Sequence, residues 1–202
     1  MEPVTKIMHF KTSSSYLEDP SRLISELTTT CSAGKIDGFS KAYLGFEVED
    51  PTNAFWVFEW ESLAAHDAYR QTETFKAIQA TAQKIYTGQP KHVFVNFSDT
   101  SRIFSAPVTE LVTSTLKEGV SMDKLEPLVT QFQAKLEGTP NFYGSSWAPV
   151  IDKPNVMYGV LGWESVQAHR DTVSSGPLKE IIDQVKEVAD IWLVHAILAP
   201  SK

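Results

Sequence analysis

The sequence predicts an α+β fold in which two copies of one β-α-β-β-α-β unit, fused in tandem, form an α/β-barrel within a single chain. A repeated motif and a repeated order of elements carry this prediction. Residues 60–66, Trp-Glu-Ser-Leu-Ala-Ala-His, recur at 163–169 as Trp-Glu-Ser-Val-Gln-Ala-His, an offset of 103 residues. The same offset joins Phe39 to Phe142. One register shared by separated landmarks indicates a duplication.

The first copy opens with alternating apolar residues and continues through helix and strand signals. Pro20 after Asp19 is typical of a helix start, and the aromatic run before Trp60 is typical of a strand. The second helix is expected to kink near Gln71-Thr72 and to end at Gly88-Gln89-Pro90. The expected elements are strand 4–11, a helix capped by Asp19, strands 39–48 and 54–60, a helix capped by Ser62, and strand 91–97.

The second copy repeats this order. Its expected elements are strand 108–116, helix 121–136, strands 142–149 and 155–163, a helix capped by Ser165, and strand 191–199. We therefore expect repeats at 1–98 and 107–202, joined by a linker at 99–106. Each ferredoxin-like unit has a four-stranded sheet whose two helices cover one face only. The uncovered faces are expected to meet inside the chain, as a barrel with pseudo-two-fold symmetry.

Composition excludes several classes of function. The net charge is −7 with no basic stripe, so a nucleic acid is not expected as a partner. No apolar run approaches the roughly 20 residues that span a bilayer, and the first residues contain no signal-peptide core. Cys31 is the single cysteine, which precludes an internal disulfide. These features predict a cytoplasmic protein with no membrane partner.

The aromatic strand followed by residues 60–69 and its echo at 163–169 resemble the dimeric α/β-barrel superfamily. The resemblance is greatest to its stress-responsive barrel and antibiotic-biosynthesis-monooxygenase branches. This superfamily contains cofactor-free cyclases, metal-free quinol-forming monooxygenases, haem-degrading proteins and members without a known reaction. The resemblance implies a pocket between the helices and the sheet of one unit.

One departure concerns a plant polyketide cyclase of this superfamily, which carries a His-Pro-x-His segment ending in its catalytic histidine. The corresponding residues here are 72–75, Thr-Glu-Thr-Phe, and 175–178, Ser-Gly-Pro-Leu. Tyr69 matches that family's helix tyrosine, but Thr172 stands at the second position. The cyclase's catalytic pair therefore does not carry over to this chain.

Histidines and one tyrosine are the candidate acid–base residues, since imidazole titrates near neutral pH. Four histidines are repeat mates, which equally fits a structural role in both copies. His9 is the exception: the offset of 103 gives it Val112 as its mate, so it is a candidate for a specialised site. The candidate catalytic residues are His9, His66, His92, His169, His195 and Tyr69.

Aromatic residues are distributed unequally between the two copies. Trp56 corresponds to Gly159, and Glu59 to Gly162. Glycines within strands mark either close approach of a ligand or bulges covered by facing side chains. The first interpretation predicts a roomier cavity in the second copy. The candidate substrate-binding residues of both copies are Tyr43, Trp56, Tyr143, Trp147, Tyr158 and Trp163.

These features predict a cofactor-independent cyclase, isomerase or lyase that acts by general acid–base catalysis on an aromatic or polyketide-type molecule. A metal-free phenol or quinol monooxygenase, and a non-catalytic binding or stress-associated protein, are the alternatives. No metal is expected, because no histidine pair or carboxylate has ligand spacing along the chain. No cofactor is expected, although a single histidine would suffice to bind haem. A barrel completed within one chain predicts a monomer or weak dimer.

Overall fold

The computed structural model describes residues 2–32 and 36–201. Four strands and four helices form the first repeat, in which a short helix precedes the predicted one. Its elements are β1 Val4–Thr12, α1 Ser14–Glu18, α2 Pro20–Ser32, β2 Phe39–Glu47, β3 Asn53–Trp60, α3 Leu63–Tyr69, α4 Glu73–Ala82 and β4 Tyr86–Val95. Those of the second repeat are β5 Val108–Leu116, α5 Met122–Leu136, β6 Phe142–Val150, β7 Lys153–Trp163, α6 Val166–Val173, α7 Gly176–Val188 and β8 Ala189–Pro200.

The helices begin where the capping residues predict. The backbone N–H of Arg22 donates to the Asp19 carboxylate over 3.0 Å at the start of α2. Ser62 Oγ accepts from the third residue beyond it over 3.1 Å, and Ser165 Oγ does so over 3.0 Å. The predicted kink divides the second helix into α3 and α4, and Thr72 caps α4. Such caps satisfy N–H groups that the first helical turn leaves unpaired.

The end of the second helix was predicted wrongly. Helix α4 ends at Ala82, and residues 88–90 lie inside β4, which begins at Tyr86. The Gly-Gln-Pro segment is typical of the residues that follow a helix. It is equally compatible with a strand at a position where the proline nitrogen is not required for a hydrogen bond to a neighbouring strand. Propensity alone does not separate these two states.

In hydrogen-bonding order the strands run β1-β3-β2-β8-β5-β7-β6-β4 and close into a barrel. Strand β3 pairs antiparallel with β1 and β2, and β7 pairs antiparallel with β5 and β6. This is the α+β fold of two ferredoxin-like repeats that the sequence predicts. The chain divides into two compact units, residues 1–94 with 200–202 and residues 95–199.

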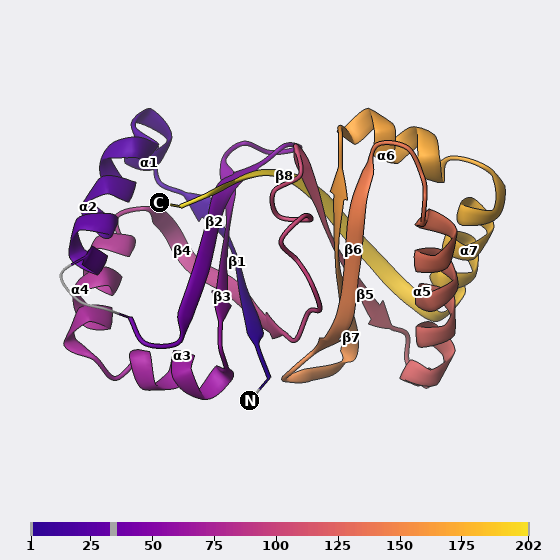
Figure 1. The fold of residues 1–202 in the computed structure, drawn as a ribbon, viewed down its shortest axis with the longest axis horizontal. Coiled ribbons are helices and arrows are strands. Elements are labelled where there is room, and N and C mark those ends of the chain that lie inside the picture. The colour runs from indigo at the N-terminus through magenta and orange to yellow at the C-terminus, as the bar shows by residue number, and fades with distance from the viewer. Residues whose placement is uncertain (1, 33–35, 202) are drawn as a thin grey trace. The chain divides into compact units, whose positions relative to one another are not determined.

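Helices lie on one face of the strands in each unit (Figure 1). In the first unit, α2 packs on α4, and the buried core includes Phe10, Leu23 and Ile85. In the second unit, α5 packs on α7 over a core that includes Leu125 and Ile181. The helices therefore cover one sheet face with apolar side chains, as the repeat pattern requires.

The segment predicted as a linker contributes to the second unit's core. Ile103 and Phe104 are 2% and 0% exposed, and Ala106 is buried beside them. The Oγ1 of Thr109 donates to the carbonyl of Ile103 over 3.1 Å. These contacts hold the segment against the first strand of the second repeat.

The strand register corrects the alignment of the repeats. Trp60 and Trp163 are 103 residues apart, but they pair with Val4 and Val108, which are 104 residues apart. The first strands are thus offset by one additional residue. His9 pairs with Phe55 in β3, and Thr113 pairs with Tyr158 in β7. The structural counterpart of His9 is therefore Thr113, and the predicted mate Val112 was wrong.

The same shift makes Glu110 the counterpart of Lys6, because Lys6 pairs with Phe58 and Glu110 pairs with Leu161. The two repeats therefore carry opposite charges at one equivalent position. A shift by one residue moves a strand side chain to the other face of its sheet, so this correction changes which residues share a site.

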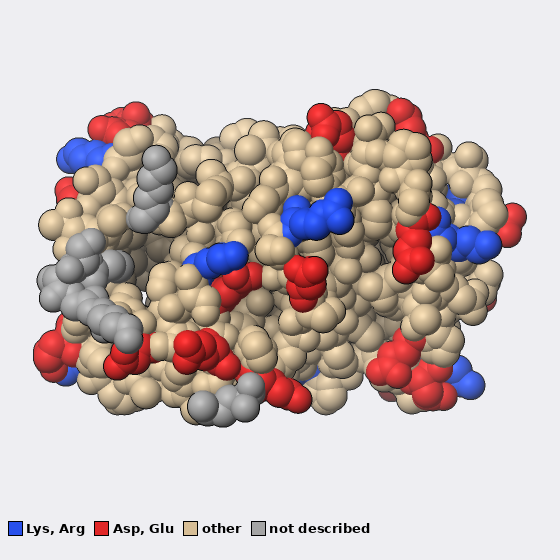
Figure 2. Space-filling model, viewed as in Figure 1, with Lys and Arg blue, Asp and Glu red and all other residues tan. Residues whose placement is uncertain are grey.

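None of the described helices is long and apolar enough to cross a membrane. On the face drawn in Figure 2, the Lys and Arg side chains lie in small separate groups, with Asp and Glu side chains among them. That face has no continuous basic surface among the residues described there.

Candidate functional site

A cavity of about 500 Å³ lies in the first unit, between helices α2 and α4 and the sheet. Ile24 of α2 and Ile78 of α4 form part of one wall, and Met8 and Leu44 form part of the sheet wall. This volume is in the range of small-molecule pockets, whose walls are mostly apolar with a few polar groups. The polar and aromatic groups that line it include Lys6, Trp56, Trp60, His66, Tyr69, Arg70 and His92.

Lys6 and His66 form the polar pair of this cavity. Lys6 Nζ lies 3.4 Å from His66 Nε2, and His66 Nδ1 lies 3.1 Å from the Oδ1 of Asp67. His66 is 2% exposed and lies in the helix that Ser62 caps. Asp67 accepts the Nδ1 proton, which leaves Nε2 to accept from the lysine. The β1 strand and the α3 cap thus fix both partners.

The surroundings disfavour positive charge on both residues. Burial, followed by the nearby Arg70, lowers the pKa of Lys6 to about 8, against the opposing effect of Asp67. Burial and then Lys6 lower the pKa of His66, while Asp67 partly opposes them. Desolvation penalises the charged form of a base. At neutral pH His66 is therefore neutral, and Lys6 readily exchanges its proton.

The Trp60 ring lines the cavity beside this pair. Its Nε1 is buried and has no hydrogen-bond partner among the described residues. In the second repeat the equivalent Trp163 donates its Nε1–H to the Oε2 of Glu110 over 2.8 Å. In the first repeat Lys6, a donor, stands at the position of that carboxylate. The cavity thus has a lysine donor on its wall and, behind the wall, a buried N–H without a partner among the described residues.

The second repeat has the equivalent space filled. A Cβ built on Gly159 would lie 2.5 Å from the Trp147 ring, and one on Gly162 would lie 2.9 Å from the Cβ atoms of Ala106 and Tyr143. Trp147 stands where the first repeat has Leu44, and it packs edge-on against Phe132. The glycines therefore accommodate facing side chains, which agrees with the second of the two interpretations that the sequence left open.

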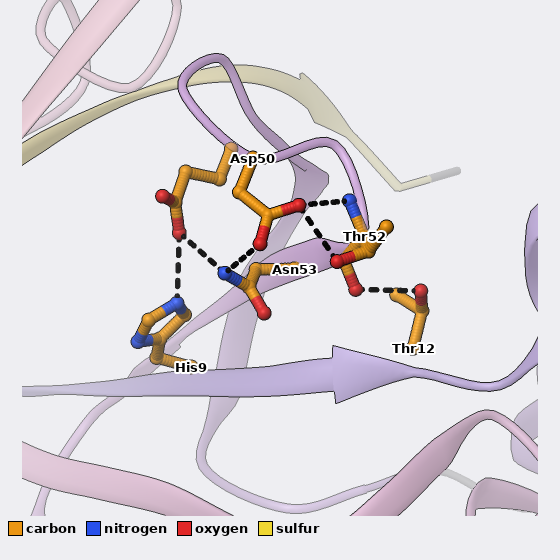
Figure 3. Close-up of polar contacts among 6 residues, drawn as sticks. His9, Thr12, Asp50, Thr52 and Asn53 are labelled. Carbon is orange, nitrogen blue, oxygen red and sulfur yellow. Dashed lines mark hydrogen bonds and ion pairs between the residues drawn. The ribbon is translucent and has the colours of Figure 1, made fainter.

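His9 lies on the sheet face that does not carry the cavity, since it alternates with Lys6 and Met8 along β1. Its Nε2 lies 3.0 Å from the Oε2 of Glu47, which also accepts from the Asn53 amide over 3.2 Å (Figure 3). Its ring stacks on Phe55 at 4.3 Å. Burial lowers the pKa of His9 against the opposing effect of Glu47. This histidine belongs to a polar network that connects β1 to the turn between β2 and β3.

Of the residues singled out from the sequence, the cavity contains His66, His92, Tyr69 and Trp56. The others lie elsewhere: His9, Tyr43, Tyr143, Trp147, Tyr158, Trp163, His169 and His195. Lys6, Trp60 and Arg70 line the cavity but were not predicted as site residues. A lysine on an alternating strand has no distinguishing sequence signal, although its correct alignment with Glu110 would have exposed the difference between the repeats.

Fold and site together define a single-chain α/β-barrel whose first repeat holds a mostly apolar cavity with a lysine–histidine pair. Residues 18–81, which extend from the end of α1 into α4, match the family described as antibiotic biosynthesis monooxygenase. The match lies within the first repeat and covers less than half of the chain, so it shows a similarity of that repeat to this family. No curated protein matches the sequence.

Solved structures share the fold over the whole chain. A candidate monooxygenase from Lactobacillus acidophilus is 14% identical with a TM-score of 0.70, covering 100% of this chain and 97% of its own. One from Fusobacterium nucleatum is 9% identical with a TM-score of 0.74, covering 100% and 94%. An anthrone oxidase-like protein is 15% identical with a TM-score of 0.72, covering 98% and 92%. At these low sequence identities, the similarity establishes a shared fold and nothing further.

Proposed function

We propose that the first-repeat cavity binds a flat aromatic phenol or enolisable ketone and removes a proton from it, and that the resulting anion reacts with molecular oxygen. The protein would then be a monooxygenase that needs no metal or organic cofactor. The observation that carries the proposal is that one mostly apolar cavity is lined by Lys6, which His66 holds, and by Trp60, whose N–H has no partner among the described residues.

Lys6 is the proton acceptor in this proposal. Burial brings its pKa to about 8, which leaves a useful fraction of neutral amine at physiological pH. Once protonated, its ammonium lies beside the anion that it has created. His66 Nε2 accepts one ammonium proton and so orients the group, and the Asp67 carboxylate fixes the histidine tautomer.

Trp60 stabilises the charge that develops on the ligand oxygen in this proposal. Its ring lines the cavity and its N–H is enclosed by protein, so the side chain turns toward the ligand when the ligand binds. Donation to the ligand then gives this buried N–H the partner that it lacks among the described residues. The rings of Trp56 and Tyr69 supply apolar surface for a flat ligand.

The oxygen step balances for a ketone with an activated methylene. The base removes one methylene proton to give an enolate, which transfers an electron to oxygen; the resulting radical and superoxide combine as a peroxide. Loss of water across the peroxide leaves a carbonyl. Overall, the methylene compound and one oxygen molecule give the carbonyl compound and one water.

Ring closure is the rival outcome of the same deprotonation, because an enolate also attacks an internal carbonyl. The two reactions differ in oxygen consumption, which is the measurement that separates them. Support for the oxygenase comes from the family matched by residues 18–81 and from the names of neighbours with the same fold.

Anthrone is the first substrate to test, since it is a flat ketone with an acidic methylene and the name of one structural neighbour points to it. Oxygen uptake and quinone formation are followed with and without protein, in air and under nitrogen. Lys6→Met should lower kcat/KM by roughly 10²–10⁴-fold, the usual contribution of a general base. Lys11→Met, at an exposed lysine of the same strand, is the matched control and should retain the full rate.

Lys6→Arg distinguishes a base from a fixed cation, because arginine keeps its charge at every working pH. We expect this variant to be as slow as Lys6→Met. The rate of the unmodified protein should rise as pH passes through about 8, the pKa of Lys6. A Lys6→Arg variant with full activity would refute the proton-transfer role. Turnover that proceeds equally under nitrogen would replace the oxygenase with a cyclase or isomerase.

A further inference from the structure

Two histidines and a glutamate meet inside the second unit, far from one another in sequence. Glu110 lies on β5, His169 on α6 and His195 on β8. They are 5%, 6% and 2% exposed, and one ligand atom from each lies within 4.8 Å of those of the other two. The cavity of the first unit does not include them.

Strand pairing and a helix cap fix this geometry. Glu110 and His195 are direct partners in the β5–β8 ladder. His169 lies in the first turns of α6, whose start is set by the Ser165 cap. His169 Nδ1 lies 2.8 Å from His195 Nε2, and His169 Nε2 lies 3.5 Å from Glu110 Oε2. These separations are therefore determined by three elements of regular structure.

The spacing suits a metal ion. Bonds of about 2.0–2.2 Å in a tetrahedral site place ligand atoms roughly 3.3 Å apart. The two observed distances lie on either side of that value but involve different nitrogens of His169, so its ring must turn until one nitrogen faces a centre shared with the other two residues, whose ligand atoms lie within 4.8 Å. Two imidazoles and one carboxylate form a donor set used by zinc and by non-haem iron.

A hydrogen bond from outside the cluster orients the carboxylate. Trp163 donates its Nε1–H to the Oε2 of Glu110 over 2.8 Å, in the way that outer partners orient metal ligands. A divalent ion would add positive charge beside this buried carboxylate, which lowers the cost of burying it.

The first repeat provides an internal comparison. By the sequence offset of 103 residues, His66 and His92 are the counterparts of His169 and His195. Lys6, however, occupies the position of Glu110 in the strand register. An ammonium repels a metal ion and offers no ligand while it is protonated. The carboxylate therefore distinguishes a repeat that could hold an ion from one that could not.

We propose that Glu110, His169 and His195 bind one divalent first-row transition-metal ion, which ties β5, α6 and β8 together. Such a site was not expected from the sequence, because spacing along the chain gives no sign of it. The burial of all three ligands indicates a structural ion. This inference does not depend on the function proposed for the first-repeat cavity.

The test uses the full chain freed of metal by dialysis against a chelator and then titrated with Zn²⁺ or Co²⁺. We expect one ion per chain by elemental analysis, and visible Co²⁺ absorption typical of tetrahedral coordination. Zn²⁺ at about 100 times its dissociation constant should raise the unfolding midpoint by roughly 5–10 °C. These readouts are independent of any catalytic activity.

Variants assign the ion to this site. Glu110→Gln keeps the shape of the side chain, removes its charge, and should weaken Co²⁺ binding at least tenfold. His195→Gln serves the same purpose if the first variant does not fold. His92→Gln, at the equivalent position of the first repeat, should leave Co²⁺ binding unchanged. Failure of the unmodified chain to bind, or binding that survives Glu110→Gln and His195→Gln, would overturn the proposal and leave a proton-linked histidine pair.

Discussion

Trp60→Phe and Trp163→Phe should differ in their effect on the free energy of unfolding. Both rings are buried, at 5% and 0% exposure, and each contacts a phenylalanine and a histidine. The loss of ring volume is therefore similar at the two positions. The polar consequences differ, because Trp163 donates to Glu110 over 2.8 Å and Trp60 has no partner among the described residues.

The difference between the two variants follows from the cost of these hydrogen bonds. A bond to a charged group contributes about 1.5–3 kcal/mol, whereas a buried donor without a partner costs about 1–3 kcal/mol in the folded state. Trp163→Phe should therefore be less stable than Trp60→Phe by at least ~1.5 kcal/mol. For a chain of this size, each kcal/mol moves the midpoint by about 2–4 °C.

Thermal unfolding of both variants at pH 7, followed by circular dichroism, measures this difference directly. A midpoint for Trp163→Phe that lies at least about 3 °C below that of Trp60→Phe supports the reasoning. Trp60→Phe should also weaken binding of a phenolic ligand, since the oxygen loses a donor. Equal midpoints would refute the assignment of the Trp60 N–H as a group kept free for a ligand.

Two further predictions concern residues outside the cavity. His9→Gln should leave turnover unchanged and cost about 1 kcal/mol of stability at pH 7, because Glu47 loses a buried partner. Because the pKa of His9 is lowered in the folded state, the unfolded chain binds a proton at this residue more readily. The free energy of unfolding therefore falls as pH drops below about 6.5. His9→Gln should lose part of this pH dependence, as measured by urea unfolding at pH 5 and pH 7. Gly159→Ala should cost about 1–3 kcal/mol through its clash with Trp147. Adding Trp147→Leu should recover part of that cost in a double-mutant cycle, and strictly additive effects would contradict the clash.

Local signals predicted much of the fold. The caps at Asp19, Ser62 and Ser165 and the strand beginning at Val108 are as expected, because a cap or an alternating pattern acts within a few residues. The pairing register between strands could not be predicted from such local signals. It depends on contacts over long distances, so the one-residue shift that aligns Lys6 with Glu110 came only from the structure.

The location of the cavity illustrates a second limit of sequence patterns. The glycines of the second repeat indicated space, but whether that space is empty depends on the side chain of a neighbouring strand. Trp147 occupies it opposite Gly159, whereas the first repeat has Leu44 opposite Trp56 at these positions, and both of those side chains line its cavity. Volume therefore had to be judged from pairs of facing residues, which the strand register identifies.

The charge at one strand position accounts for how the two repeats differ. Where the residue is Glu110, the tryptophan N–H and both histidines have an acceptor near them, and the site is closed and buried. Where it is Lys6, the tryptophan N–H has no acceptor among the described residues, and the neighbouring space is a cavity. A single exchange between these residues would thus add or remove an acceptor for three side chains that both repeats share. This position, more than the histidines common to both repeats, distinguishes the half with the cavity from the half with the buried histidine–glutamate cluster.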